Sequence, residues 1–408
     1  MANSGWHLEL VILIILLGFI GYSIFSKSVS RTMLTLPIIF LSLGFLLSGP
    51  VNEVSADSDN INAAARLIAE ITLVLVLFAD ASHVRFSRLR DSFKLPLRML
   101  VIGLPLTVAF GTAVVYVLNP TAGLAMALLT AAVLTPTDAA LGQSVVSSPD
   151  VPARLSETIN VESGLNDGLV LPFVLIGAIF ASSGTGPAET GGLALSIVTQ
   201  LTLGPLVGIA MGWLIARLLD IAQERDWIFE SAEGVVFLAT AFATFIVSEQ
   251  VGGNGFIAAF VAGMVFGNTY KHDPTFISEF MEGAGQILTM TAFLGFGALL
   301  LPDGLNHMTL QAVIVAVSFL TFVRILPIWL SLAGASLPER EKLFLGWFGP
   351  RGLASILFTL IIMDEFDFPA EDELLSCVAM TVFFSVFLHG LSANPLVRRI
   401  GLSQEDKN

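Results

Sequence analysis

Charged residues are scarce in this chain of 408 residues, at 13%, whereas 55% are hydrophobic and the mean hydropathy is +0.83. Soluble domains carry about 25% charged residues, so the composition excludes an ordinary water-soluble protein. The single cysteine, Cys377, excludes an internal disulfide and a cysteine-based metal cluster. A net charge of −14 argues against a nucleic-acid partner. The composition therefore indicates a polytopic protein of the lipid bilayer.

Apolar runs of about 20 residues, the length that crosses the hydrocarbon core, recur along the whole chain. The first run follows no basic segment and precedes no small-residue cleavage site, so we expect a retained helix and not a signal peptide. The sequence predicts an all-α membrane protein with about thirteen transmembrane helices, at approximately 7–25, 31–49, 61–80, 96–118, 121–147, 153–182, 191–219, 232–251, 254–269, 277–300, 307–334, 341–363 and 373–397.

Basic residues collect in alternate loops between these predicted helices. Every Lys and Arg except Arg66, Arg324 and Arg351 falls after an odd-numbered helix, and the other loops carry acids, as in 364–373. Because Lys and Arg favour the cytoplasmic side, we expect a multi-pass protein of the cell (inner) membrane with its N-terminus outside and its C-terminus in the cytoplasm. Arg66 is expected to snorkel. Arg324 and Arg351 lie deeper, and each needs an acidic or carbonyl partner.

Two apolar runs carry a short motif with a proline and a charged residue: Thr-Pro-Thr-Asp at 135–138 and Gly-Pro-Arg-Gly at 349–352. Proline removes a backbone donor, so both helices should unwind there. If two inverted six-helix repeats, approximately 7–182 and 232–398, flank a linker helix at 191–219, each break falls in the fifth helix of its repeat. Such paired breaks point to a transport site at mid-membrane. We predict one transmembrane domain, 1–400, and a short cytoplasmic tail, 401–408.

In the sixth run, residues 162–167 carry two acids and an amide where a membrane helix should have none. A carboxylate at membrane depth costs roughly 2.5–3.5 kcal/mol, so it usually faces a cavity, a partner or an ion path. At about 100° per residue, Ser163 and Asp167 share one helix face, and Glu162 and Asn166 share a neighbouring one. We therefore expect Asp167 to be the exchangeable site and Glu162 to pair with an arginine from another helix.

Oxygen ligands suit a hard cation such as sodium. The candidates are the carboxylates of Asp167 and Asp138, the hydroxyls of Thr137 and Ser163, and carbonyl groups freed by the break. Burial favours a protonated carboxyl group and a nearby cation favours the ionised form, so proton and metal ion compete for one carboxylate. Competition at a site that faces each side in turn is sufficient for exchange. The sequence thus predicts a secondary transporter, not an enzyme, that needs no cofactor beyond its transported sodium and protons.

These motifs resemble the monovalent cation:proton antiporter family, and within it the first branch, with the bacterial sodium/proton antiporters of the NhaP type and the eukaryotic exchangers. The resemblance covers nearly the whole membrane domain. It rests on Pro136-Thr137-Asp138, Glu162-Ser163-x-x-Asn166-Asp167, Arg324 and Gly349-Pro350-Arg351-Gly352.

The resemblance implies roles for particular residues. It makes Asn166 and Asp167 the ion-binding pair, has Thr137 and Asp138 contribute from the crossing helix, and joins Glu162 to Arg324 by a salt bridge. It also implies a homodimer, a part in pH homeostasis and, from the Asn-Asp pair, electroneutral exchange of one proton per cation. One departure concerns the broken helix, because the family usually has proline just after the aspartate. Here Ala139 follows Asp138, which leaves open the carbonyl groups that are freed.

Other functions are compatible with parts of the pattern. A potassium/proton antiporter would use the same oxygens. A cation channel lacks support, because no filter loop or arginine-rich sensor helix is present. An intramembrane aspartyl protease expects Gly-x-Gly-Asp, but Leu165 and Asn166 precede Asp167. Arg351 is expected to be structural or gating, and Asp80, in the third helix, to pair with nearby basic residues and not to line a funnel. For transport, we expect helices five, six, twelve and thirteen to move against a dimerising scaffold.

Overall fold

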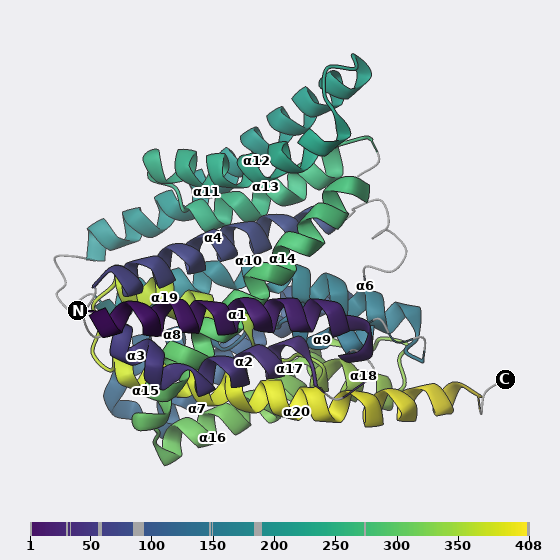
Figure 1. Ribbon diagram of the computed structural model, residues 1–408. Helices are drawn as coiled ribbons and strands as arrows, with labels where there is room; N and C mark the ends of the chain where they lie inside the picture. The colour runs from purple at the N-terminus through teal and green to yellow at the C-terminus, as the bar shows by residue number, and fades with distance from the viewer. Residues whose placement is uncertain are drawn as a thin grey trace.

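The computed structural model describes residues 2–29, 32, 34–55, 59–84, 94–146, 148, 150–182, 190–272 and 275–405 (Figure 1). This part of the chain is helical and contains no strand. The side chain of Arg66 and the last residues of the predicted tail, 406–408, lie outside the described residues. The all-α prediction is confirmed.

The helices follow the predicted apolar runs closely, and several runs consist of consecutive helical pieces. In chain order they are α1 (Ala2–Val29), α2 (Leu36–Leu46), α3 (Ser48–Ser55), α4 (Asp59–His83), α6 (Lys94–Arg98), η1 (Met99–Gly103), α7 (Leu104–Leu118), η2 (Pro120–Ala122), α8 (Gly123–Val133), α9 (Ala139–Val146), α10 (Ala153–Ser182), α11 (Thr190–Glu224), α12 (Glu230–Gln250), α13 (Gly255–Thr269), α14 (Thr275–Gly295), η3 (Phe296–Leu300), α15 (Leu301–Asn306), α16 (Leu310–Leu320), α17 (Phe322–Ser331), α18 (Glu339–Trp347), α19 (Leu353–Glu365) and α20 (Glu371–Glu405).

Eight helical stretches in the described residues are long and apolar enough to cross a membrane. Shorter apolar helices accompany them at Leu36–Leu46, Pro120–Val133 and Gly255–Thr269. The count of about thirteen spans is therefore not confirmed. Both α11 and α20 run past the predicted ends of their apolar segments, and α20 includes the first part of the predicted tail, 401–405. Hydropathy marks where a helix leaves the hydrocarbon, and a helix can continue into water beyond that point.

Both predicted breaks are present. The first lies between the end of α8 at Val133 and the start of α9 at Ala139, and the second between the end of α18 at Trp347 and the start of α19 at Leu353. The two breaks touch, because the Asp138 N–H donates to the carbonyl oxygen of Pro350 at 2.8 Å. Each proline disrupts the helical hydrogen-bond ladder of its segment, and the freed backbone groups of one break meet those of the other.

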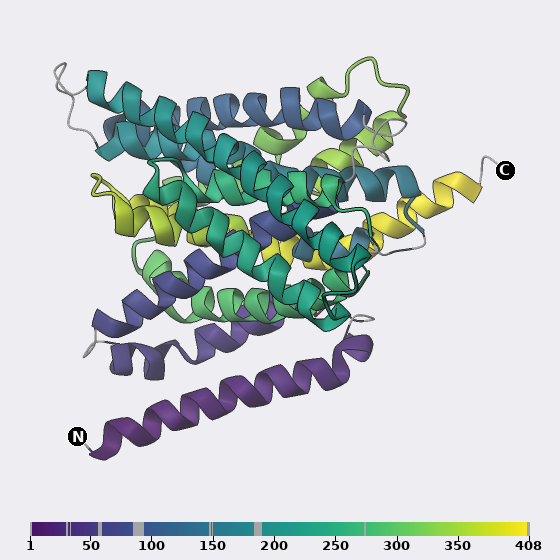
Figure 2. The ribbon, with the colours of Figure 1, turned by 90° about the horizontal axis from the view of Figure 1, so that it is seen from above.

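The helices run roughly parallel and antiparallel, with α11, α12 and α13 along one edge of the bundle and α7, α16 and α20 along the opposite edge (Figure 1). Figure 2 shows α1 on the outside of this bundle. Glycines allow close helix crossings: a Cβ added to Gly263 of α13 would lie 2.1 Å from the Phe78 carbonyl oxygen of α4. The two ends of the chain lie at opposite ends of the bundle (Figure 1).

Candidate functional site

The two broken helices stabilise each other's open ends. The Asp138 carboxylate accepts a hydrogen bond from the Leu353 N–H at 2.7 Å, at the N-terminus of α19. The Arg351 guanidinium donates to the carbonyl oxygens of Thr135 and Pro136, which follow the C-terminus of α8. A negative group at a helix N-terminus and a positive group at a C-terminus both oppose the helix dipole. The crossing thus satisfies groups that the breaks leave without helical partners.

This crossing decides which oxygens remain available. We expected carbonyl groups freed by unwinding to be candidate ligands, yet those of Thr135 and Pro136 already accept hydrogen bonds from Arg351, which is fully buried. Arg351 thereby has the carbonyl partners that its depth requires. Gly352 makes the close contact possible, because a Cβ there would lie 2.1 Å from Oδ2 of Asp138.

Beside the crossing, Glu162 of α10 and Arg324 of α17 form an ion pair with two hydrogen bonds. Nη1 of Arg324 donates to Oε1 of Glu162 at 2.7 Å, and Nη2 donates to Oε2 at 2.9 Å. The Arg324 side chain is only 4% exposed and the Glu162 side chain only 3%. Removal of either partner would leave the other as a buried charge without an ion-pair partner, so each residue depends strongly on the other.

Thr137 and Asn166 are turned toward this ion pair. The Thr137 hydroxyl donates to Oε2 of Glu162 at 3.2 Å and accepts from the Asn166 amide. The same amide lies 3.5 Å from Oε1 of Glu162, and the hydroxyls of Thr137 and Ser163 are 3.1 Å apart. The structure therefore brings the predicted residues together but engages the Thr137 hydroxyl and the Asn166 N–H groups with Glu162.

Asp167 has one carboxylate oxygen that makes no hydrogen bond in the described structure. It is 7% exposed, and its Oδ1 is buried without a hydrogen-bond partner among the described residues. Oδ1 of Asn166 is in the same condition. Buried acceptors without a partner are rare in folded proteins. A bound proton or cation would supply the partner that these two oxygens lack. Asp138, Glu162 and Arg351 lie within electrostatic range of the Asp167 carboxylate.

A further carboxylate, that of Asp80 in α4, was expected to pair with nearby basic residues. It lies within electrostatic range of both Asp138 and Asp167. It packs against Gly164 of α10, where a Cβ would be in ordinary van der Waals contact with Asp80, 3.7 Å from its Cβ. Asp80 stood out in the sequence as an acid inside an apolar run, but the sequence did not show which helices α4 packs against. The site thus has three aspartates, one from α4, one from the first break and one from α10.

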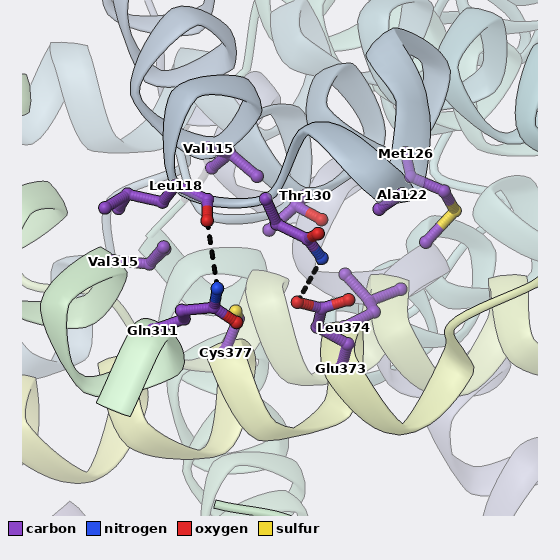
Figure 3. A pocket seen from close by; sticks show the side chains of 11 residues that line it. Val115, Leu118, Ala122, Met126, Thr130, Gln311, Val315, Glu373, Leu374 and Cys377 are labelled. Atoms are coloured by element: carbon purple, nitrogen blue, oxygen red, sulfur yellow. Dashed lines mark hydrogen bonds between the residues drawn. The ribbon is translucent and has the colours of Figure 1, made fainter. Parts of the chain in front are cut away.

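The described residues contain no group of three or more His, Cys, Asp or Glu side chains placed to hold a metal ion together. They do form a pocket of about 360 Å³, part of it open space, between the ends of α7, α8, α16 and α20 (Figure 3). There Asn119 donates to the Glu373 carboxylate, and Gln311 donates to the Leu118 carbonyl oxygen at 3.0 Å. None of the predicted site residues lines this pocket, so it is separate from the crossing.

Comparison with solved structures gives the same fold. The sodium proton antiporter MjNhaP1 from Methanocaldococcus jannaschii, solved at pH 8, aligns with a TM-score of 0.75 over 97% of this chain and 99% of that chain, at 19% identity.

Sequence comparisons place the chain in a family. It is 25% identical over 373 residues to the K(+)/H(+) antiporter NhaP2 of Shewanella oneidensis and covers 63% of its length, while the match spans 90% of this chain. The Na(+)/H(+) antiporter NhaG of Bacillus atrophaeus is 27% identical over 290 residues, which are 69% of this chain and 54% of that relative. The chain thus spans less than two thirds of the length of these relatives. The profile described as "Sodium/hydrogen exchanger, transmembrane" matches residues 12–399, so the chain belongs to the sodium/hydrogen exchanger family, a family of secondary transporters.

Proposed function

We propose that this chain exchanges sodium or lithium for protons, with the cation and the proton competing for Asp167. The observation that carries the proposal is the buried Oδ1 of Asp167, which has no hydrogen-bond partner in the described structure and lies beside two crossed helix breaks. A carboxylate in this setting gains from binding either a proton or a hard cation, but it cannot hold both. Exchange follows if occupied Asp167 faces each side of the membrane in turn.

The other site residues have supporting roles in this proposal. We propose that Oδ1 of Asn166, the carboxylate of Asp138 and the hydroxyl of Ser163 contribute oxygen ligands, while Asp80 acts through its charge. Thr137 has less freedom, because its hydroxyl already joins Glu162 and Asn166. The ion pair of Arg324 and Glu162 joins α17 to α10 and keeps the Glu162 carboxylate engaged.

We propose electroneutral exchange of one cation for one proton. The Asn166 side chain cannot titrate, so the Asn-Asp pair offers a single exchangeable carboxylate. Asp138 is held as a cap on α19, and Glu162 is neutralised by Arg324. Under this proposal Asp80 attracts the cation without carrying the exchanged proton.

The proposed arrangement in the cell follows from charge and topology. The two chain ends lie at opposite ends of the bundle (Figure 1), which supports an external N-terminus and a cytoplasmic C-terminus. We propose a homodimer in the cell membrane that serves pH homeostasis. Within the single domain, 1–400, the segment with the crossed breaks and α10 and α20 would move against the α11–α13 side.

Potassium/proton exchange is the second candidate. Relatives from Shewanella oneidensis and Alkalimonas amylolytica are both named K(+)/H(+) antiporters, the latter at 26% identity over 402 residues. Sodium and potassium use the same oxygen ligands, so the site geometry alone does not separate them. The transport assay must therefore include both ions.

The test is cation-driven dissipation of an imposed pH gradient in proteoliposomes, with the membrane potential clamped. Wild type is compared with Asp167→Asn under sodium, lithium, potassium and choline. Asp226→Asn is the matched control, because Asp226 is exposed and its φ of 56° suits asparagine. We expect Asp167→Asn to lose all cation-dependent proton movement and Asp226→Asn to keep it.

A response to potassium alone in wild type would establish the second candidate. If folded wild-type protein responds to no cation, or if Asp167→Asn transports normally, the proposed exchange at Asp167 is wrong. A cation current without proton movement would favour the channel interpretation.

A further inference from the structure

Three polar residues on one face of α20 contact the second helix break. Ser385, His389 and Ser392 are spaced four and three residues apart, which aligns them along the helix. The Arg351 N–H donates to the Ser385 hydroxyl at 2.6 Å. Nε2 of His389 lies 3.0 Å from the Trp347 carbonyl oxygen, and the Trp347 indole N–H donates to the Ser392 hydroxyl at 3.1 Å. The stripe therefore contacts both ends of the break.

The break needs partners of this kind. Residues 348–352 belong to neither α18 nor α19, and the Arg351 N–H there donates to a side chain and not to a helical carbonyl group; without such a partner a buried backbone group is costly. Ser385 and His389 are 0% and 2% exposed, so water cannot substitute for them readily. The His389 ring also packs on Trp347, with 5.4 Å between ring centroids.

The neutral histidine with its proton on Nε2 makes the contacts with Trp347 and with the Ser385 hydroxyl, while its Nδ1 also lies 3.1 Å from the Ser385 carbonyl oxygen without donating to it. With the proton on Nε2, His389 donates to the Trp347 carbonyl oxygen, and its Nδ1, 3.3 Å from the Ser385 hydroxyl, accepts from it. The Ser385 hydroxyl in turn accepts the Arg351 N–H. A continuous hydrogen-bond chain then joins both ends of the break to α20.

We propose that His389 and Ser385 are positioning residues for transport, which hold the backbone of the second break so that the Arg351 guanidinium stays on the carbonyl groups of the first break, beside Asp167. The proposal rests on the exchange function proposed above. Neither residue contacts the cation. Both act through Arg351, whose side chain donates to Thr135 and Pro136 and lies within electrostatic range of Asp167.

The expected consequence is a change in apparent affinity for the cation. The Arg351 guanidinium fixes the geometry of the crossing beside Asp167. If the break loosens, the oxygen ligands around Asp167 are less well placed, which weakens binding of a cation that needs several oxygens more than binding of a proton that needs one. A tenfold loss of cation affinity raises the apparent KM for sodium about tenfold at fixed pH, with little change in the rate at saturating sodium.

The experiment measures KM and maximal rate for sodium in proteoliposomes at several pH values. The variants are His389→Ala, Ser385→Ala and His389→Gln. Glutamine can donate to the Trp347 carbonyl oxygen and accept from the Ser385 hydroxyl, but it does not titrate. Thr381→Ala is the matched control, since Thr381 is also a buried α20 hydroxyl and bonds only within the helix, to the Cys377 carbonyl oxygen. Thermal unfolding of each variant is recorded.

We expect the two alanine variants at positions 385 and 389 to show the raised KM at near-normal maximal rate. His389→Gln and Thr381→Ala should behave like wild type. A purely structural role would lower the maximal rate through loss of folded protein and leave KM unchanged, which would overturn the proposal. So would a glutamine variant as impaired as alanine, because that result would assign His389 a proton-carrying role. If wild type itself shows no exchange, the proposed function fails and not this inference alone.

Discussion

The buried ion pair between Glu162 and Arg324 offers the sharpest test of how the site is held together. Arg324→Ala removes two short charge-assisted hydrogen bonds and leaves Glu162 charged at a position 3% exposed. The remaining neutral partners, Thr137 and Asn166, cannot compensate a full charge. Breaking one side of a buried pair costs about 3–5 kcal/mol. We expect the free energy of unfolding to fall by about that amount.

The measurement is unfolding in detergent by intrinsic fluorescence, with denaturant and with heat. Arg225→Ala is the matched control, because Arg225 is exposed and its contact is with the Trp227 ring, 4.8 Å from the centroid. An exposed contact of this type contributes about 0.5–1 kcal/mol. Replacing both members of the buried pair, as in Glu162→Gln with Arg324→Met, should cost less than Arg324→Ala alone, since no unpaired charge remains.

Thermal unfolding of Arg324→Ala equal to that of wild type would refute this reasoning. It would mean that Glu162 takes up a proton, or that water reaches the pair, at little cost. In that case Glu162 would be a second titrating group in the site, and the electroneutral proposal would need to be reconsidered.

Two further predictions concern helix packing and pH. Gly263→Ala should destabilise the protein by about 1–3 kcal/mol, because its Cβ would meet the Phe78 backbone, whereas Gly283→Ala, with nothing within 4 Å, should be neutral or stabilising in the same unfolding assay. The Lys342 ammonium holds the pKa of Glu339, outside the apolar spans, below its usual range, so this contact is present at neutral pH and is lost as pH falls through the lowered value. Any stability difference between wild type and Glu339→Gln should therefore shrink as pH falls below the usual glutamate pKa of about 4.3 and vanish below the lowered pKa; a difference that grows on acidification would contradict the assignment.

Much of the fold was predictable because its signals are local. Long uncharged runs specify membrane helices wherever they lie in the chain, and Pro136 and Pro350 prevent regular helix at their own positions. Both breaks were predicted at the residues where α8 and α18 give way to extended chain. The helix ends were less accurate, as in α20, because polar sequence outside the hydrocarbon remains free to be helical.

The site was predictable as a set of groups, but of its contacts only the Glu162–Arg324 salt bridge was expected, from the family resemblance. Acids at 138, 162 and 167 stand out against an apolar background, since each would be costly there without a use. The sequence could not show that Arg351 occupies the carbonyl groups of the first break, or that Asp80 lies near Asp167. These contacts join helices far apart in the chain, and a side chain's partner depends on which helices cross and at what height.

The sequence by itself determined the membrane class, the two breaks and the acids that we propose for cation and proton exchange, because hydropathy, proline geometry and carboxyl chemistry are properties of short segments. The tertiary structure alone decided that Thr137 and Asn166 engage Glu162 beside its pair with Arg324, and that Oδ1 of Asp167 is left without a hydrogen-bond partner among the described residues. The physical reason is that hydrogen bonds and ion pairs between helices form only once packing has fixed the crossing of α8, α10, α17 and α19.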